Sequence, residues 1–529
     1  MAVPVMWGAR SSRTPVVGAA IAALVVFCGL PLTYMLVEAA TTGTLYAPLL
    51  LDARQRSLLY TTTALGTGTA VVATLLGAPL GVALARVALP WKPAWRIALA
   101  APVLLPPYVT GLAWVYLGGS AGVLARIAGH DLLSAWTYSL PGAIAVLGLV
   151  YYPLPMLATE TALRRVEPRL EEAALVAAAP GRVLRHVTLP LVAPAVGAAA
   201  LVVFVLAISE FGVPGLLRVR VFTTEVFTAF AAQYDFGRAT ILALPLLGLS
   251  VAIAAGAALL AGDRLVVTRR GATGGRPVTF DGWTRPACAA AAGLLALAVV
   301  APLAVLAAEA SGVSSVSAIV RGSREAIRNS LVMAALSATA VTAIAVWLGY
   351  ARARAPRPFG ALADVVFVML FAVPSTVVGV GLIGVWNRAG LFGRIYGTAG
   401  MIVLASLARF LPVAALVLGA AIRAVPASHE EAATVVGAGW WRTATRIVLP
   451  QARPALITSW LVVFVLAFGE LGTSILVAPP GESTLPIRIY TIIANTPSSQ
   501  VAALALLQAA VVLGPLVLLA MATRVWRRP

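Results

Sequence analysis

The amino-acid sequence predicts an all-α polytopic membrane protein, and composition, hydropathy and an internal repeat each support this. Of the 529 residues, 60% are hydrophobic and 11% are charged, whereas soluble domains have roughly 45–50% and about 25%. The mean hydropathy is +0.95. Apolar runs of about 20 residues, the length of a helix that crosses a bilayer, recur along the whole chain. The composition therefore excludes a soluble fold.

Twelve apolar runs are long enough to be membrane spans. The predicted spans are residues 15–37, 59–85, 97–118, 139–163, 191–213, 239–262, 286–308, 329–350, 361–386, 397–422, 454–478 and 500–523. The first run is longer than the apolar core of a signal peptide and has no convincing small-residue cleavage site, so we expect it to be retained as a span.

The basic residues are distributed unevenly between the two sides of the predicted membrane. With the N-terminus inside, 25 of the 38 Lys and Arg residues fall in cytoplasmic segments and 12 in outer segments. Cytoplasmic loops of membrane proteins carry such an excess of positive charge. The net charge of +19 is therefore interpreted as an orientation signal rather than as a nucleic-acid surface, and both termini are predicted to be cytoplasmic.

The two cysteines, Cys28 and Cys288, both lie in apolar spans. The chain has no paired-cysteine spacing and no Cys/His cluster, so neither a disulfide framework nor a metal site is predicted.

A repeat divides the chain into two similar halves. The stretch Leu201–Ala207 recurs letter for letter as Leu461–Ala467, and each copy continues into Glu-x-Gly, at Glu210 and Glu470. Each half holds six spans, an even number, so both halves face the same way and the repeats are parallel. We predict a first repeat at 1–262, a Gly- and Arg-rich cytoplasmic linker at 263–285 and a second repeat at 286–529.

Each half carries a charged, helix-compatible stretch between its fourth and fifth spans, residues 167–190 and 426–450. The first reads EEAALVAAAPGRVLRHVTLP from Glu171, and the second reads EEAATVVGAGWWRTATRIVLP from Glu430. The residues singled out are Glu171, Glu172, Ala173, Ala177, Leu189 and Pro190 in the first, and Glu431, Ala432, Ala433, Gly437, Leu449 and Pro450 in the second. Aligned with an offset of 260 residues, the first copy has Glu172 at the first Ala of Glu-Ala-Ala and Ala177 at the Gly.

These two stretches resemble the EAA loops of permease subunits of ATP-driven, binding-protein-dependent importers of bacterial inner membranes. The resemblance implies a MetI-like fold, with two such permease repeats fused in one chain. It also implies two cytoplasmic ABC ATPase subunits, which the EAA loops contact through the Glu residues, and an extracytoplasmic solute-binding protein. The Glu-Phe-Gly-Val-Pro sequence after Ser209 and the Leu-Pro-Ile-Arg-Ile-Tyr sequence from Leu485 look most like the ferric-iron group.

The chain carries no ATP site of its own. A P-loop needs Gly-Lys-Ser/Thr after a Gly-rich turn, and the single Lys, Lys92, stands between Trp91 and Pro93. No cofactor is expected on this chain, with ATP and Mg²⁺ on the partner ATPase, and we predict that the chain is not itself an enzyme.

Candidate pathway residues are the breaks and charges inside the predicted spans. Helix-breaking residues stand at matching places of the third span of each half, at Pro106, Tyr108 and Gly111, and at Pro374, Ser375, Thr376 and Gly379. They line a cavity or are packing kinks. Charges within spans are costly and point to function, here Glu210, Glu470 and Arg409. The alternative for the two carboxylates is a helix-end charge that meets water or backbone amides, and Arg409 is a candidate ion-pair partner of Glu470.

Other functions remain open from sequence alone. The cargo is ferric iron or, in the same class of importer, thiamine, aminoethylphosphonate or a polyamine. From other classes, an ion-gradient-driven secondary transporter fits the twelve spans and the parallel halves but does not account for two EAA loops, and a membrane receptor would need an output domain.

Overall fold

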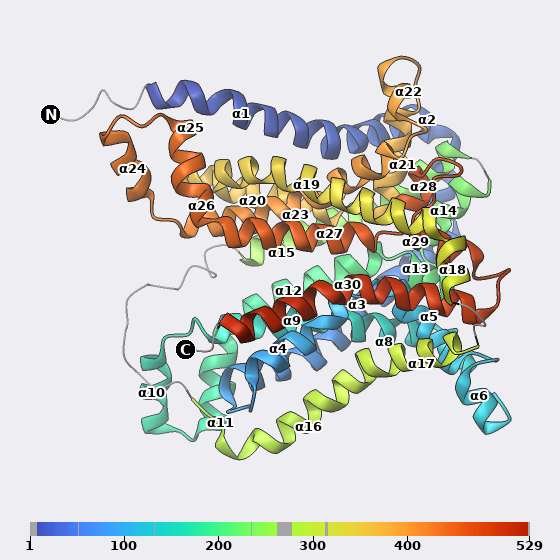
Figure 1. Cartoon of the computed structure of the whole chain (residues 1–529), viewed down its shortest axis with the longest axis horizontal. Coiled ribbons are helices and arrows are strands. Elements are labelled where there is room, and N and C mark those ends of the chain that lie inside the picture. The colour runs from blue at the N-terminus through green and yellow to red at the C-terminus, as the bar shows by residue number, and fades with distance from the viewer. Residues whose placement is uncertain are drawn as a thin grey trace. The chain divides into compact units, whose positions relative to one another are not determined.

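The computed structural model describes residues 8–50, 52–131, 133–233, 235–261, 278–312 and 316–526. Every regular element in these ranges is a helix (Figure 1). Eight helices are long and apolar enough to cross a membrane, and three bent helix pairs raise that number to 11. A shorter apolar helix, Ser498–Gly514, coincides with the last predicted span. The predicted all-α polytopic fold is confirmed, and the predicted count of twelve is close to this one.

The third predicted span of each half is broken. In the second half, the helix that ends at Ala372 and the helix α21 (Ser375–Trp386) meet at 91°. In the first half, α4 (Lys92–Ala100) and a 3₁₀ turn are followed by α5 (Pro107–Gly118). Pro106 and Pro374 immediately precede α5 and α21 with extended ψ angles of 128° and 149°. Proline lacks the N–H and disfavours a preceding helical residue, so the interruptions predicted at Pro106 and Pro374, within the spans 97–118 and 361–386, are confirmed.

Four π-turns occur at matching places of the two halves, each two residues before a proline. They are Val25–Gly29, Leu184–Thr188, Ala296–Val300 and Ala444–Val448. Because the proline ring clashes with the carbonyl four residues back, the turn widens, and the residue after it donates to the carbonyl five residues back, as Leu189 N–H does to Leu184 O. The Leu-Pro pairs therefore lie inside helical segments rather than at their start.

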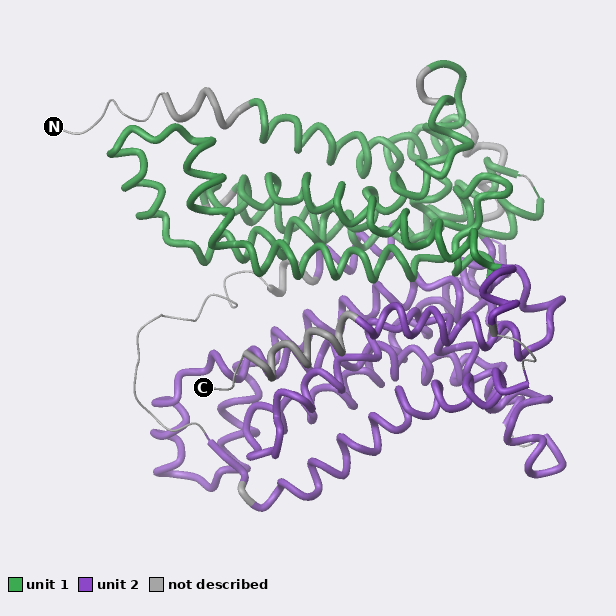
Figure 2. The backbone as a smooth tube through the Cα atoms, in the orientation of Figure 1, with its two compact units in different colours: residues 1–48, 226–247, 323–488 green, residues 49–225, 248–322, 489–529 purple. Residues whose placement is uncertain are grey.

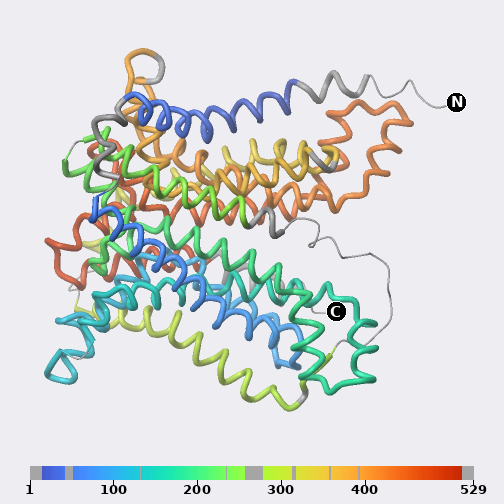
Figure 3. The backbone as a smooth tube through the Cα atoms, turned by 180° about the vertical axis from the view of Figure 1, so that it is seen from behind, coloured from blue at the N-terminus to red at the C-terminus, as the bar shows by residue number. Residues whose placement is uncertain are grey.

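One compact unit consists of residues 49–225, 248–322 and 489–529 (Figure 2, purple). Its central helix is α3, which packs against α8, α9 and α12, and Figure 3 shows α3 in blue from the other side. A methyl group at Gly77 would lie 2.3 Å from Tyr152 O, and one at Gly81 2.4 Å from Met156 O. Glycine thus permits the close approach of α3 and α9. The helices that lie wholly in this unit are α3 (Ala53–Arg86), α4, α5, α6 (Val123–Ala128), α7 (Ser134–Thr137), α8 (Leu140–Tyr151), α9 (Pro153–Leu163), α10 (Pro168–Ala177), α11 (Pro180–Val183), α12 (Leu189–Ser209), α13 (Gly212–Leu216), α16 (Thr284–Leu295), α17 (Ala301–Ala310), α18 (Val316–Gly322) and α30 (Ser498–Trp526).

The other compact unit consists of residues 1–48, 226–247 and 323–488 (Figure 2, green). Its central helix is α19, which packs against α23 and α27, and again glycines permit the approach, because a methyl at Gly349 would lie 2.7 Å from Gly419 N. The helices that lie wholly in this unit are α1 (Gly8–Leu24), α19 (Arg324–Arg354), α20 (Arg357–Ala372), α21, α22 (Leu391–Ile395), α23 (Gly400–Ala424), α24 (Ala427–Val435), α25 (Trp440–Thr443), α26 (Leu449–Gln451), α27 (Arg453–Phe468) and α28 (Ser474–Val477). Four helices straddle unit boundaries: α2 (Leu30–Leu50), α14 (Phe222–Ala231), α15 (Phe236–Ala261) and α29 (Leu485–Ile492).

The compact units do not coincide with the halves of the sequence, because the first helix of each half, the last helix of the second half (α30) and residues 226–247 of the first half belong to the unit built on the other half's central helix. Helix α1 of the first half packs against α19 and α23, whereas α17 of the second half packs against α5. The predicted boundaries at 262 and 286 describe the order of repeats along the chain and remain a prediction. Residues 263–277 of the predicted linker lie outside the described residues, the described part of the chain resumes at Val278, and α16 begins at Thr284.

Candidate functional site

The first EAA loop is built around a buried carboxylate. Glu171, on the first turn of α10, has no exposed surface. Arg86, the last residue of α3, donates from Nη2 to Glu171 Oε1 at 2.8 Å, and the hydroxyl of Thr188 donates to the same oxygen at 2.9 Å. The backbone N–H of Val278 donates to Oε2 at 3.0 Å. Three donors thus satisfy this buried charge and hold α10 against the end of α3.

The second EAA loop repeats the ion pair with Glu430 rather than Glu431. Glu430, on the first turn of α24, is buried. Arg354, the last residue of α19, donates from Nε to Glu430 Oε1 at 2.6 Å. The hydroxyl of Tyr350 donates to Oε2 at 2.6 Å, and Trp440 Nε1 donates to that hydroxyl at 3.1 Å.

The structure corrects the alignment of the two loops. Glu171 and Glu430 occupy the same place and are 259 residues apart, whereas Leu189 and Leu449 are 260 apart. The second loop therefore contains one additional residue, which falls between α24 and α25, where Gly437 adopts φ of +78°. Ala178, which follows α10, is extended at φ −148° instead. Glu171 is not the counterpart of the exposed Glu431, and Ala177 is not the counterpart of Gly437; Glu172 and Ala178 are.

Both loops expose valine side chains. Val176 on α10 is 91% exposed, and Val435 and Val436 at the end of α24 are 86% and 81% exposed. Of the other predicted loop residues, Ala173, Ala177, Leu189, Pro190, Ala432 and Pro450 are exposed, Glu172 and Leu449 are partly buried, and Ala433 is buried. Isolated exposed apolar residues are ordinary, but the same feature on two equivalent loops indicates a surface for a partner.

The broken third spans bring the predicted pathway residues against the short helix that follows each fifth span. A methyl at Gly111 would lie 3.3 Å from Val213 of α13, and one at Gly379 would lie 2.7 Å from Leu476 of α28. Thr473 donates from its hydroxyl to Ser375 O at 2.9 Å. Packing therefore accounts for both glycines.

Other residues at these breaks are buried polar groups. Tyr108 is buried and its hydroxyl donates to the side-chain oxygen of Gln508 on α30. Thr376 is fully buried, and its hydroxyl has no hydrogen-bond partner in the part of the chain that the structure describes. An unpaired buried hydroxyl is unfavourable, and a hydrated pathway would supply its partner.

The carboxylates of the Glu-x-Gly motifs accept backbone N–H groups at the start of those short helices. Glu210 accepts from Gly212 N at 3.0 Å, and Glu470 accepts from Thr473 N at 2.8 Å. This is the helix-end alternative that the sequence left open. Glu470 also forms the predicted ion pair, because Arg409 Nη1 lies 2.6 Å from its Oε2 and both side chains are largely buried. The Arg409–Glu470 pair is confirmed, whereas contact of any of these groups with cargo stays a prediction.

Sequence reasoning missed the groups that complete the two loops. From the sequence, Arg86 and Arg354 are two of the basic residues that set orientation, and nothing distinguishes Tyr350 or Val278. The available signal was positional, since each arginine is the last helical residue before an extended segment that leads to a proline.

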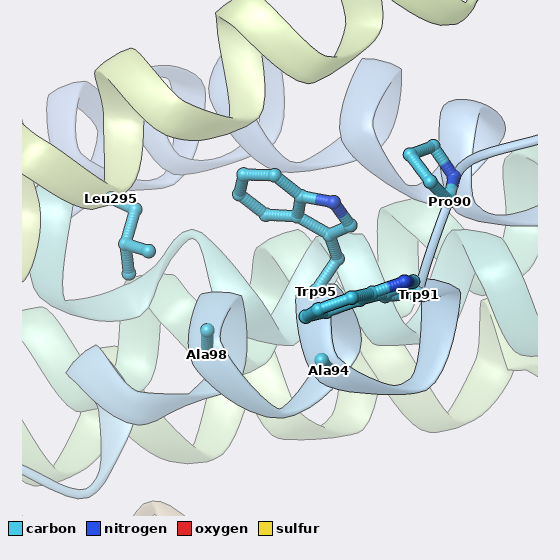
Figure 4. Close-up of a pocket in the computed structure, with 6 residues that line it drawn as sticks. All are labelled: Pro90, Trp91, Ala94, Trp95, Ala98 and Leu295. Carbon is cyan, nitrogen blue, oxygen red and sulfur yellow. The ribbon is translucent and has the colours of Figure 1, made fainter.

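Two further features bear on binding. An apolar hollow of about 420 Å³ lies between α4 and α16, lined by Pro90, Trp91, Ala94, Trp95, Ala98 and Leu295 (Figure 4). Its lining offers no charged group to an ionic solute. Within the described ranges, no group of three or more His, Cys, Asp and Glu residues could hold a metal ion.

Comparison with known proteins agrees with this architecture. Residues 341–528 match the family model described as "Binding-protein-dependent transport system inner membrane component". The chain is 24% identical to "Fe(3+)-transport system permease protein FbpB 2" of Haemophilus influenzae, over 88% of this chain and 91% of that protein. It is 23% identical to "Putative ferric transport system permease protein FbpB 1" of the same organism, over 80% and 69%. A further relative, "Molybdenum transport system permease protein ModB" of Escherichia coli, is 29% identical over 33% of this chain and 82% of the relative.

The helical fold, the repeated halves and the paired loops define a multi-pass membrane permease. The family match over residues 341–528 and the similarity to ferric transport permeases over most of the chain support, more narrowly, a permease component of a binding-protein-dependent importer.

Proposed function

We propose that this chain is the two-repeat permease of a ferric-iron importer, with both termini in the cytoplasm, and that it works with two ATPase subunits and a solute-binding protein. The observation that carries the proposal is the pair of equivalent loops. Each loop has a buried Arg–Glu pair at its contact with the central helix and at least one valine side chain exposed to solvent. Ferric cargo is supported by the names of the relatives that cover most of the chain.

The loops have the features that a coupling surface needs. A rigid contact requires a side chain that packs into the partner and a base that does not yield when the partner moves. Val176 and Val435 provide the exposed apolar side chains. The buried pairs Arg86–Glu171 and Arg354–Glu430 connect each loop helix to the end of a long central helix, so that a displacement of the loop would be passed along α3 or α19.

The first loop differs from the sequence-based expectation in one respect. Glu171 is buried, and its carboxylate oxygens bind donors within this chain. We therefore propose that Glu172 and the exposed Glu431 are the acidic residues that face the ATPase. Breaking the buried pair instead would disturb the loop from within.

A suitable experiment joins the chain, its ATPase subunit and its binding protein in lipid nanodiscs and measures ATP hydrolysis. We expect the ferric-loaded binding protein to stimulate hydrolysis, and the double variant Val176→Asp/Val435→Asp to lose ATPase co-purification. Ile127→Asp is the matched control, since Ile127 is 78% exposed but lies on α6, far along the chain from either loop.

The outcomes separate the parts of the proposal. Retention of the ATPase by the double valine variant would contradict the coupling surface. Stimulation that ferric iron does not affect would keep the importer and change its cargo. Aminoethylphosphonate is then the first alternative to test, because "Putative 2-aminoethylphosphonate transport system permease protein PhnV" of Salmonella typhi is 26% identical over 24% of this chain.

A further inference from the structure

We propose that Val278–Thr284, the segment through which the chain enters its second half, is a clasp that positions the first coupling loop. The inference concerns positioning residues of the coupling loops and rests on the proposed function only for its consequence for ATP hydrolysis. The clasp itself follows from contacts within one compact unit.

The clasp bonds to both partners of the buried ion pair. Val278 N–H donates to Glu171 Oε2 at 3.0 Å. Phe280 N–H donates to Arg86 O at 3.1 Å. Since Arg86 also donates to Glu171, the segment closes a ring of contacts that joins α3, α10 and the start of the second half.

Apolar contacts and a third hydrogen bond keep the clasp in place. Val278 is 1% exposed, and Phe280 packs on the hydrophobic core of its unit. Thr284 donates from its hydroxyl to Ala88 O at 3.4 Å. Helix α16 begins at that residue and packs against α3 and α4, so the clasp is anchored on its C-terminal side by a helix of the same unit.

In the second loop, Glu430 accepts from two side chains of its own central helix, those of Tyr350 and Arg354. The hydroxyl of Tyr350 donates to Glu430 Oε2, as Val278 N–H donates to Glu171 Oε2 in the first loop. Tyr350 lies four residues before Arg354 on the same helix. The second donor to the buried glutamate therefore comes from the central helix in the second loop and from the clasp in the first. The position of α10 thus depends on the clasp, whereas that of α24 depends on the side chains of Tyr350 and Arg354.

The test is hydrogen exchange of the full-length chain in nanodiscs, which needs neither ATPase nor cargo. Val278→Pro removes the N–H donor. A hydrogen bond to a charged group is worth enough to slow opening by about tenfold or more, so amide exchange in 168–177 should accelerate at least tenfold while exchange in 427–435 is unchanged. Tyr350→Phe should give the reverse pattern. Val278→Ala, which keeps the N–H, should accelerate exchange in 168–177 much less.

A cut in the chain provides the second arm. A protease site placed between residues 264 and 272 leaves Val278–Thr284 attached to α16, and cleavage should leave exchange in 168–177 at the uncut rate. Equal exchange in wild type and Val278→Pro would overturn the proposal, as would acceleration of both loops by that variant or acceleration by the cut alone.

The same variants in the assembled importer test the consequence for coupling. Val278→Pro should lower the ratio of binding-protein-stimulated to basal ATP hydrolysis, and the cut chain should keep that ratio. A changed exchange pattern in a chain that recruits no ATPase would support the clasp and refute the proposed function. An unchanged ratio in Val278→Pro, with exchange in 168–177 accelerated, would overturn the role of the clasp in coupling.

Discussion

The two EAA loops share a buried Arg–Glu ion pair and differ in the other groups that bind the glutamate. In both, the arginine that ends the central helix pairs with a buried glutamate on the first turn of the loop helix, at 2.8 Å in the first and 2.6 Å in the second. The first loop adds Thr188 and the backbone of Val278, whereas the second adds Tyr350 and one extra residue between α24 and α25. The repeated pair is therefore the common base, and the remaining contacts are where the halves have become unequal.

The largest expected effect comes from removing the arginines. Arg86→Leu leaves Glu171 fully buried with the neutral donors Thr188 and Val278 but no countercharge, which destabilises by about 3–5 kcal/mol. Arg354→Leu leaves Glu430 with the Tyr350 hydroxyl and some access to water, so we expect roughly 1–3 kcal/mol, the effect of an imperfectly satisfied buried polar group. The free energy of local opening of α10 and α24, measured by hydrogen exchange, checks both values.

The double variant Arg86→Leu/Glu171→Leu is the control for this comparison. Replacing both charges by apolar groups is often close to neutral, but the buried Thr188 hydroxyl and Val278 N–H lose their acceptor, so the double variant should recover part of the stability lost in Arg86→Leu. A double variant as unstable as the single one would show that the lost packing of arginine, not the unpaired carboxylate, is responsible.

The Arg409–Glu470 pair tests whether amide exchange in the second loop depends only on that loop's own ion pair. It lies in the same compact unit as the second loop but joins α23 to the segment after α27. A cycle of Arg409→Leu, Glu470→Gln and the double variant should give a coupling energy of about 0.5–3 kcal/mol in thermal unfolding. Exchange in 427–435 should not change, and acceleration there would mean that the second loop depends on remote contacts.

The exposed valines sharpen the comparison at the surface. Val176→Asp and Val435→Asp should each weaken ATPase binding about tenfold, or about 1.4 kcal/mol, because each puts a charge where an apolar contact is proposed. Surface changes of this kind usually alter stability by less than about 0.5 kcal/mol, so the melting temperature of the isolated chain is the control. A large loss from one variant and none from the other would mean that a single loop carries the attachment.

Much of this architecture could be predicted from sequence, because hydropathy and repetition are local signals. The twelve apolar runs, the two loops and the Arg409–Glu470 pair were all visible in the order of residues. Other features depend on tertiary contacts. The exchange of first helices between compact units leaves no trace in hydropathy, because α1 is apolar whichever central helix it packs against.

The alignment error within the loops has a similar physical origin. The Leu-Pro ends fix an offset of 260 residues, and extending that offset to the glutamates pairs Glu171 with Glu431. Only burial distinguishes the two glutamates of each stretch, and burial depends on where Arg86 and Arg354 lie. The one additional residue between α24 and α25 changes the offset from 259 at the buried glutamates to 260 at the Leu-Pro ends.

Substitutions at Gly437 and at its counterpart Ala178 test the comparison of the two loops at a single backbone position. Its φ of +78° lies in the left-handed region, and no atom lies within 4 Å of where a methyl group would stand. Gly437→Ala should therefore cost only the backbone strain, about 1–2 kcal/mol, and accelerate exchange in 427–435. The matched change, Ala178→Gly, falls at an extended residue where alanine is unstrained, so it should lower stability only by the added freedom of the unfolded chain, about 0.4–1 kcal/mol. Equal and negligible effects of both changes would mean that the extra residue of the second loop relaxes without strain, and that the two loops differ only in what closes them.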